Sequence, residues 1–253
     1  MESHIQLMVA DIVHQVQDRD GEPFDPHRLI TGSTMAVLWR VLFGYNVDSF
    51  DPQLIQVMHW MEALSRRRKY AVIADLFPLL RFLPKIRREL SASNEAQKKL
   101  LTHLSELIEK NVVDRHDASF VGCFRETEGP GFGGDELLYV LHDLVCVGTE
   151  MISATLKWAV LLLANHPDVQ RRCQEQIDAV VAPPRRLPSL DDRPSLPYVE
   201  AAILEIMRCK TVIPMSVPRE TLRDTVLAGH LIPAGTMVKF VLFHSIMVIP
   251  SVL

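Results

Sequence analysis

The sequence predicts a mainly α-helical fold, a helical bundle with a small β-hairpin near the C-terminus. Two observations carry this prediction. Apolar residues recur at helical spacing over most of the chain, and the apolar stretch from Leu137 to Ala164 contains no proline. After Cys209 the pattern changes to short segments separated by turn residues, which is typical of strands.

The helices of the N-terminal half follow from apolar periodicity and from residues that start helices. The first helix has an apolar face made of Ile5, Met8, Val9, Ile12, Val13 and Val16. A second helix is expected from Pro26 to Phe43. Asp51 and Pro52 are suited to the N-cap and N1 positions of a third, which should end near Lys69. Two prolines, Pro78 and Pro84, should break the segment that follows.

In the C-terminal half, a polar helix is expected from about Ile86 to Val113. The long helix over 137–164 should follow, with Asp135 as its N-cap. Shorter helices are predicted from Pro167 to about Val181 and from Tyr198 to Cys209. The segment "TVLAGHLIPAGTMVKFV" predicts a β-hairpin that turns around Pro233, Ala234 and Gly235.

Composition excludes several classes of protein. A chain of 253 residues fits one large domain or two small ones. The net charge of −4 argues against a globally basic protein that binds nucleic acid. The four cysteines form no CxxC pair, which favours free thiols in a reducing compartment over a zinc site or disulfides. No stretch of about 18 uncharged apolar residues occurs, so no membrane-spanning helix is predicted, and the first residues do not resemble a signal peptide.

Polar residues recur along the long apolar helix. Glu136, Asp143, Glu150 and Lys157 lie seven residues apart and therefore form one slowly drifting stripe. The stripe has two interpretations, a solvated edge of an amphipathic helix or a polar seam that faces an internal site.

Glu205 and Arg208 in "EAAILEIMRCK" lie three residues apart, on one face of a predicted helix. Their neighbours are mostly apolar, so we expect the helix and the pair to be buried. Because a buried ion pair is a poor source of stability, a functional or fold-specifying role is as plausible as a purely structural one.

Several segments occur in the order found in cytochrome P-450 monooxygenases, which the chain resembles from its first helix to about Val238. These are "GEPFDPHRLI", "VLFGYNVDSFD", "LFPLLRFLP", the long helix, "HPDVQRRCQEQIDAVV", "LPSLDDRPSLPYVEAAILEIMR", "VPRETLRD" and "GHLIPAGT". The microsomal branch, whose members metabolise drugs and fatty acids, is the most similar.

The resemblance implies one partial cytochrome P-450 domain over residues 1–253. Residues 1–134 would form the distal, substrate-side helices, 135–181 the long central helix and the helix after it, and 198–240 the ExxR helix and the hairpin. The implied cofactor is haem. The implied reaction is O₂-dependent hydroxylation of an apolar small molecule such as a fatty acid, steroid or xenobiotic, with electrons from NADPH-cytochrome P-450 reductase. The implied location is the cytoplasmic face of the endoplasmic reticulum membrane.

The resemblance also assigns roles to particular residues. Glu205 and Arg208 match the ExxR pair on the proximal side of the haem, and Arg219 matches the residue that pairs with a haem propionate. Val147, Gly148 and Glu150 belong to the segment that passes over the haem iron. There the glycine would let the backbone approach oxygen closely, and the acid would help to organise the proton supply.

The chain departs from the family pattern at two places that bear on chemistry. Met151 stands where the family has a proton-relaying threonine, and Ser153 lies about 200° around the helix from it. Val147 is larger than the residue usual there. None of the four cysteines lies in the Phe-x-x-Gly-x-x-x-Cys loop that supplies the axial thiolate, so the chain is assigned no metal ligand, and the family's N-terminal anchor is also not found. We therefore expect these 253 residues alone to form no haem-thiolate complex, and the alternative interpretation is a truncated, non-catalytic helical protein.

Residues 66–88 contain eight basic residues and one acidic residue, with a mostly apolar run between the basic ends. A nuclear-localisation signal would use only Arg66 to Lys69. The apolar residues belong either to the core or to a segment that lies in a membrane interface, where Lys and Arg meet anionic lipid. The resemblance favours the second interpretation and predicts a peripheral membrane contact through residues 70–84.

Overall fold

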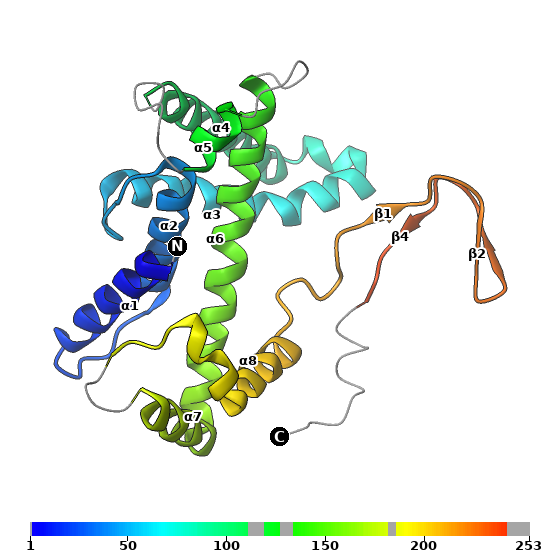
Figure 1. Cartoon of the computed structure of the whole chain (residues 1–253). Coiled ribbons are helices and arrows are strands. Elements are labelled where there is room, and N and C mark those ends of the chain that lie inside the picture. The colour runs from blue at the N-terminus through cyan, green and yellow to red at the C-terminus, as the bar shows by residue number, and fades with distance from the viewer. Residues whose placement is uncertain (1, 111–118, 127–133, 182–185, 242–253) are drawn as a thin grey trace. The chain divides into compact units, whose positions relative to one another are not determined.

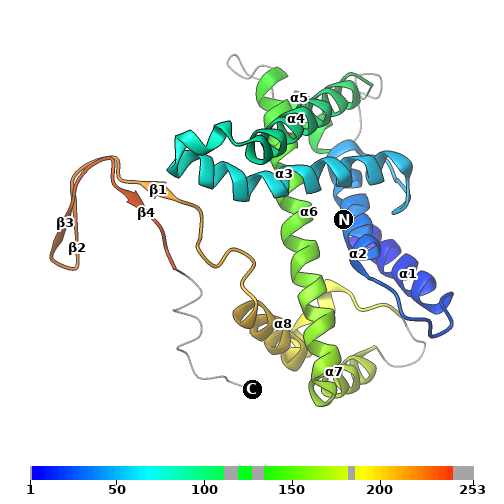
Figure 2. The ribbon, with the colours of Figure 1, turned by 180° about the vertical axis from the view of Figure 1, so that it is seen from behind.

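The computed structural model describes residues 2–110, 119–126, 134–181 and 186–241. The chain divides into two compact units, Met1–Ser153 and Ala154–Leu253, and each is described by itself (Figures 1 and 2). Both units are mainly helical, and the strands all lie in the second unit. The predicted fold class, a helical bundle with a small β-hairpin near the C-terminus, is therefore confirmed.

Within its described residues, the first unit contains six helical segments and most of a seventh. They are α1 (Glu2–Gln17), α2 (His27–Phe43), α3 (Pro52–Leu76), the 3-10 helix η1 (Pro78–Phe82), α4 (Pro84–Lys110), α5 (Phe120–Glu126) and the first part of α6 (Gly134–Asn165). Helix α1 packs along α2, and α3 packs along α4.

The core of the first unit lies where α2, α3, α4, α5 and α6 meet. Its side chains recur at helical spacing on each helix, as the sequence pattern predicts. The largest fully buried members are Met35, Trp39, Leu42, Phe43, Leu54, Val57, Leu100, Leu104, Val121, Leu137, Leu141 and Val145. Burial of one such side chain contributes about 1.5–3 kcal/mol, so this cluster dominates the packing of the unit.

Two predicted helix boundaries are wrong, for identifiable reasons. Helix α3 continues past Lys69 to Leu76, because nothing disfavours helix until Pro78. Proline restricts the residue before it, and Phe77 accordingly leaves the helical region with φ −131° and ψ 82°. Asp135 is not the N-cap of the long helix but lies in its first turn, where its charge complements the helix dipole.

The second unit contains the end of α6 and the helices α7 (Pro167–Val180), η2 (Leu190–Ser195) and α8 (Pro197–Cys209). Helix α7 packs against α8. Gln176 on α7 supports the start of α8, because its Oε1 accepts hydrogen bonds from the backbone N–H groups of Tyr198 and Val199 at 3.0 and 3.1 Å. Asp192 closes a capping box with Ser189 at the start of η2.

The described part of the second unit also contains four short strands. β1 (Arg219–Glu220) pairs with β4 (Met237–Val238), and β2 (Thr225–Leu227) pairs with β3 (His230–Ile232), both antiparallel. The predicted turn position is wrong. The β2–β3 hairpin turns at Ala228 and Gly229, whose φ angles of 51° and 83° suit a type I′ turn. Pro233 to Gly235 instead connect β3 to β4.

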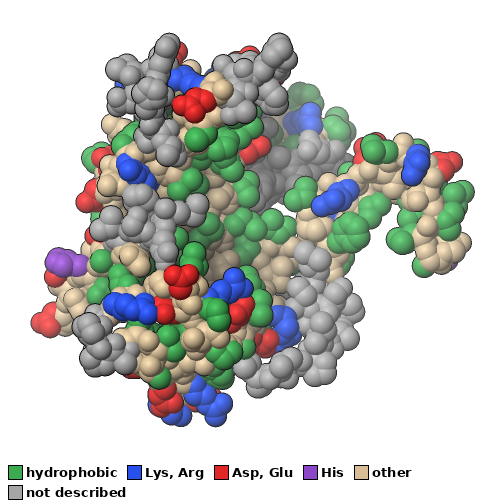
Figure 3. Space-filling view, viewed as in Figure 1, with side chains coloured by type: hydrophobic (Ala, Val, Ile, Leu, Met, Phe, Trp, Pro, Cys, Tyr) green, Lys and Arg blue, Asp and Glu red, His purple; other side chains and the backbone are tan. Residues whose placement is uncertain are grey.

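Exposed apolar side chains gather on these strands, as Figure 3 shows in green at the right of the view. Leu222 is 99% exposed, and Val226 and Leu231 are 66% and 67% exposed.

Elsewhere in the described chain, α6 is the one helix long and apolar enough to cross a membrane by length and composition. Charged residues interrupt the sequence of α6, so this helix contains no run of about 18 uncharged apolar residues, and the sequence therefore predicted no membrane-spanning helix.

Candidate functional site

Helix α6 presents two faces within the first unit. Leu141, Val145 and Thr149 recur every fourth residue and are fully buried against the other helices. On another side of the helix, Val140, Leu144 and Val147 are 39%, 36% and 56% exposed. We call Val140, Leu144, Val147 and the half-buried Met151 the α6 outer face.

Gly148 lies between these two faces and allows a close helix contact. A Cβ atom at this position would lie 3.2 Å from Cδ2 of Leu38, on α2. The glycine therefore has a packing role in this structure, because a side chain here would force Leu38 to move.

Glu150 differs from the rest of the polar stripe. Asp143 has a 79% exposed side chain that meets only its neighbour His142, and Glu136 is exposed, so this part of the stripe is a solvated edge. Glu150 is half-buried, and its Oε1 accepts a hydrogen bond from the hydroxyl of Ser65, on α3. The carboxylate of Glu150 is thus held by a residue far away in the sequence.

Three hydroxyl residues, Thr149, Ser153 and Thr155, lie within one helical turn of Met151, and Thr155 is half-buried one turn further along α6. The hydroxyl groups of Thr149 and Ser153 point away from the α6 outer face. Ser153 is 1% exposed, and its Oγ donates to the carbonyl oxygen of Thr149 at 2.6 Å. Thr149 is fully buried, and its Oγ1 has no hydrogen-bond partner among the described residues. Between residues 147 and 153, all of which are described, the outer face therefore carries no hydroxyl group.

In the second unit, Glu205 and Arg208 form the predicted ion pair. Nε and Nη2 of Arg208 donate to Oε2 and Oε1 of Glu205, both at 2.6 Å. Hydrogen bonds from Arg208 hold the pKa of the Glu205 carboxyl below its ordinary value. The thiol of Cys209 approaches the same carboxylate, with Sγ 3.5 Å from Oε1.

The sequence predicts that this pair is buried, but the structure shows that it is only partly buried. The side chains of Glu205 and Arg208 are 19% and 21% exposed. On α8 only Ala202 and Ile206 are buried, because this helix packs against α7 on one side. The pair lines a mostly apolar cavity of about 470 Å³, together with residues such as Leu162 and Val169.

Arg219 lies apart from this pair, on β1. Its residue is exposed, its backbone pairs with Val238, and it makes no side-chain hydrogen bond or ion pair with the residues that the structure describes. Val147, Gly148, Glu150 and Met151 thus share a helix in the first unit, whereas the ion pair and Arg219 belong to the second.

All four cysteines are free thiols. Cys123 is exposed, and Sγ of Cys146 lies 3.9 Å from Nε2 of His142. Burial raises the pKa of the Cys173 and Cys209 thiols, which disfavours their thiolate forms. Within the described residues, no group of three or more His, Cys, Asp or Glu side chains could hold a metal ion.

Sequence reasoning missed three residues that support the candidate site: Ser65, Leu38 and Cys209. Ser65 and Leu38 contact α6 from helices far away in the sequence, and no local pattern marks such a contact. Cys209 follows Arg208 directly, so its adjacency to the pair was the only available signal.

Comparisons with known proteins bear on the whole chain. The model of the family described as Cytochrome P450 matches residues 1–246. The chain is 34% identical over 235 residues to Cytochrome P450 2F5 of Gorilla gorilla gorilla, which covers 89% of this chain and 48% of that protein. It is 32% identical over 252 residues to Cytochrome P450 2J2 of Homo sapiens, which covers 94% of this chain and 49% of that protein. It is also 29% identical over 245 residues to Cytochrome P450 1A1 of Rattus norvegicus, which covers 92% of this chain and 44% of that protein. The chain spans about half the length of these relatives, and the match over nearly all of its own length shows that it belongs to the cytochrome P450 family.

Proposed function

We propose that the protein is a haem-dependent monooxygenase, which uses O₂ and electrons from NADPH-cytochrome P-450 reductase to hydroxylate an apolar small molecule. Membership of the family supports the reaction class. The single structural observation that carries the proposal is the α6 outer face, where exposed apolar side chains lie one helical turn from the held carboxylate of Glu150.

Haem is the cofactor of this family, and part of the chain fits it. In the first unit, Val147 and Met151 on the α6 outer face would contact a flat, mostly apolar ring. In the second unit, the exposed guanidinium group of Arg219 would suit a propionate. When bound, haem supplies the oxidising chemistry by activating O₂. The axial thiolate is not assigned to any of the four cysteines, because none of them lies in a Phe-x-x-Gly-x-x-x-Cys segment. Burial also disfavours the thiolates of Cys173 and Cys209.

The residues of the chain act on the substrate and on protons. The outer face would contact an apolar substrate such as a fatty acid, a steroid or a xenobiotic, and would exclude water from it. Glu150, held by Ser65, would accept and pass on protons from solvent. The thioether of Met151 cannot donate a proton, so proton delivery should be inefficient, and a share of the reducing equivalents should leave as hydrogen peroxide.

Glu205, Arg208 and Arg219 belong to the second unit and would support the binding of haem there. The two hydrogen bonds from Arg208 to Glu205 would hold the end of α8 in place near the cofactor. Because removal of one partner leaves the other charge unpaired, this pair should tolerate substitution poorly.

A peripheral contact with the endoplasmic reticulum membrane is part of the proposal. Phe77, Leu79 and Phe82 are 61%, 81% and 80% exposed around η1, so they do not belong to the core. Exposed basic residues flank them, at Arg66 and Arg81 and at 85, 87 and 88. Apolar side chains between cations are typical of a segment that enters a headgroup region. The expected contact over 70–84 is therefore narrowed to the residues around η1.

The test uses the whole protein that the transcript encodes, and this protein is reconstituted with haem, reductase and an apolar substrate. We expect oxidation of NADPH and formation of a hydroxylated product, both dependent on haem. Substitution of Val147 by Asp, which places a charge on the apolar outer face, should abolish product formation while the protein stays folded. If no haem-dependent oxidation occurs with the folded protein, the proposed function is wrong.

A further inference from the structure

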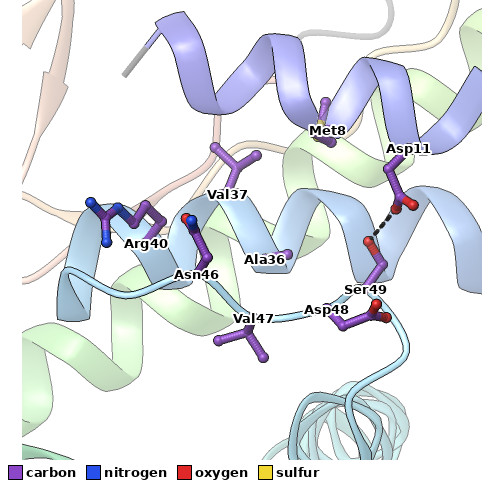
Figure 4. A pocket seen from close by; sticks show the side chains of 9 residues that line it. All are labelled: Met8, Asp11, Ala36, Val37, Arg40, Asn46, Val47, Asp48 and Ser49. Atoms are coloured by element: carbon purple, nitrogen blue, oxygen red, sulfur yellow. Dashed lines mark hydrogen bonds between the residues drawn. The ribbon is translucent and has the colours of Figure 1, made fainter.

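A cleft opens between α1, α2 and the loop that follows α2, entirely within the first unit (Figure 4). We call it the α1–α2 cleft. Its volume is about 210 Å³, and the apolar side chains of Met8 and Val37 lie between α1 and α2 in its middle. This volume suits a small metabolite, since pockets for drug-sized ligands measure about 300–1,000 Å³. No residue of the cleft takes part in the proposed oxidation.

One end of the cleft carries a fixed carboxylate. Asp11 accepts hydrogen bonds from Oγ of Ser49 at 2.9 Å and from Nε2 of Gln15 at 3.1 Å. Ser49 is 7% exposed, and its Oγ lies 3.3 Å from that of the fully buried Ser33. Gly32 permits this close approach of the loop, because a Cβ atom there would collide with the carbonyl oxygen of Ser49. An ionised carboxylate has about four acceptor sites, so Asp11 can still accept a bond from a cationic donor.

The other end of the cleft carries the guanidinium group of Arg40, which is available to bind a ligand. Arg40 is half-buried and makes no ion pair or side-chain hydrogen bond with any residue in the described part of the chain. Asn46 lies beside Arg40 in Figure 4 and adds an amide. Asp48 also lines the cleft, but its Oδ1 accepts the backbone N–H of Phe50 at 2.7 Å. The planar fork of Arg40 is therefore available to a carboxylate.

The separation of the two ends follows from α2. Ser33, which marks the Asp11 end, and Arg40 are seven residues apart on this helix. At 1.5 Å per residue their backbones lie roughly 10 Å apart along the axis, and the guanidinium can bend back toward the middle. A ligand that fills the cleft thus needs opposite charges at its ends and a short apolar chain between them.

We propose that the α1–α2 cleft binds a small aliphatic zwitterion, whose ammonium group bonds Asp11 and whose carboxylate bonds Arg40. The aliphatic chain lies over Met8 and Val37. A ligand with only one of the two charges leaves the opposite end of the cleft without a partner, and so binds more weakly.

The first test titrates 6-aminohexanoate into the 253-residue chain by calorimetry, with hexanoate and hexylamine as ligands that each lack one charge. We expect 6-aminohexanoate to bind roughly tenfold more tightly than either, which corresponds to one hydrogen bond to a charged group. Equal affinity for 6-aminohexanoate and for one of the single-charge ligands overturns the proposal, as does no binding of 6-aminohexanoate.

Matched variants locate the ligand. Arg40→Ala should lower the affinity for 6-aminohexanoate to that for hexylamine and leave hexylamine binding unchanged. Asp11→Asn should lower it to that for hexanoate. Lys98→Ala and Glu109→Gln, which remove exposed charges on α4, should have no effect.

A third variant tests the cleft without changing a charge. Val37→Phe, on α2, should fill the cleft and weaken binding of 6-aminohexanoate, hexanoate and hexylamine alike. If Asp11→Asn unfolds the chain, Arg40→Ala and Val37→Phe decide the question. Parental affinity in both of these variants means that the ligand binds elsewhere and that the proposal is wrong.

Discussion

Phe77, Leu79 and Phe82 offer the sharpest test of the membrane contact. Their exposed fractions of 61%, 81% and 80% show that all three point into solvent around η1. At roughly 150–200 Å² per side chain, they present about 400 Å² of apolar surface. Complete transfer of this surface out of water would contribute about 10 kcal/mol, at 25 cal/mol per Å². If about half of this surface is immersed, the transfer free energy is still roughly 5 kcal/mol.

The triple substitution Phe77→Ser, Leu79→Ser, Phe82→Ser should therefore weaken vesicle binding by roughly 10³–10⁴-fold, because each 1.4 kcal/mol corresponds to a factor of about ten. Binding is measured by co-sedimentation with vesicles that contain anionic lipid. It should fall as salt is raised, because Arg and Lys around η1 contribute about 1 kcal/mol each near an anionic surface. Leu80 is left unchanged, because it is half-buried, although the sequence alone gave no reason to distinguish it from Leu79.

A matched control replaces Leu222, Val226 and Leu231 by Ser, since these side chains are 99%, 66% and 67% exposed but lie outside the basic segment. This control should bind vesicles like the parent. The triple variant at η1 should also keep the parental urea midpoint, because exposed side chains contribute little to the core. If it unfolds, and the parent does not bind vesicles, the three residues are packed in the protein and the reasoning is wrong.

Three further predictions concern stability. Gly32→Ala should cost about 1–3 kcal/mol in urea unfolding, because the new Cβ would lie 2.4 Å from the backbone oxygen of Ser49. Gly148→Ala, where the nearest atom is the mobile end of Leu38 at 3.2 Å, should cost less, and an equal cost in both variants would contradict the contact at Gly32. Glu205→Gln should lower the urea midpoint more than Glu200→Gln, because the Glu200–Arg193 pair is more exposed, at 40% and 69%. The reverse order would show that the Glu205–Arg208 pair contributes nothing. Asp192 has a pKa held well below its ordinary value, chiefly by hydrogen bonds from Arg186. The parent should therefore have a larger free energy of unfolding than Asp192→Asn at pH 7, and this difference should shrink as the pH falls below about 4. A difference that does not depend on pH would refute this assignment.

Helix positions were predictable where breakers and caps mark them. Helix α2 begins within one residue of its predicted start, and it ends at Phe43 because Gly44, with φ 84°, caps it. The end of α3 was missed because the basic run at 66–69 suggested a boundary, whereas no backbone reason to stop exists before Pro78. The hairpin turn was misplaced because Pro-Ala-Gly is a stronger local signal than Ala-Gly. Only the pairing of β2 with β3 reveals the turn at Ala228 and Gly229.

The candidate site was predictable in part for a similar reason. The pair Glu205 and Arg208 lies within one helical turn, so its geometry follows from local spacing. Its partial exposure does not, because that depends on which other helices pack against α8. The contact of Ser65 with Glu150 joins residues 85 positions apart and arises only from the packing of the first unit. The α1–α2 cleft likewise joins residues of α1 with α2 and the loop after it, so it arises only from their packing.

The coupling of NADPH oxidation to product formation tests the central claim most directly. The protein as its transcript encodes it is reconstituted with haem and reductase, and NADPH consumed, product and hydrogen peroxide are measured for the parent and for Met151→Thr. Met151 lies half-buried on the α6 outer face, and no hydroxyl group lies on that face between residues 147 and 153. We predict that the threonine hydroxyl raises the ratio of product to NADPH and lowers the share of peroxide. An unchanged ratio in a folded Met151→Thr protein would contradict the assignment of the α6 outer face as the place where oxygen and substrate meet.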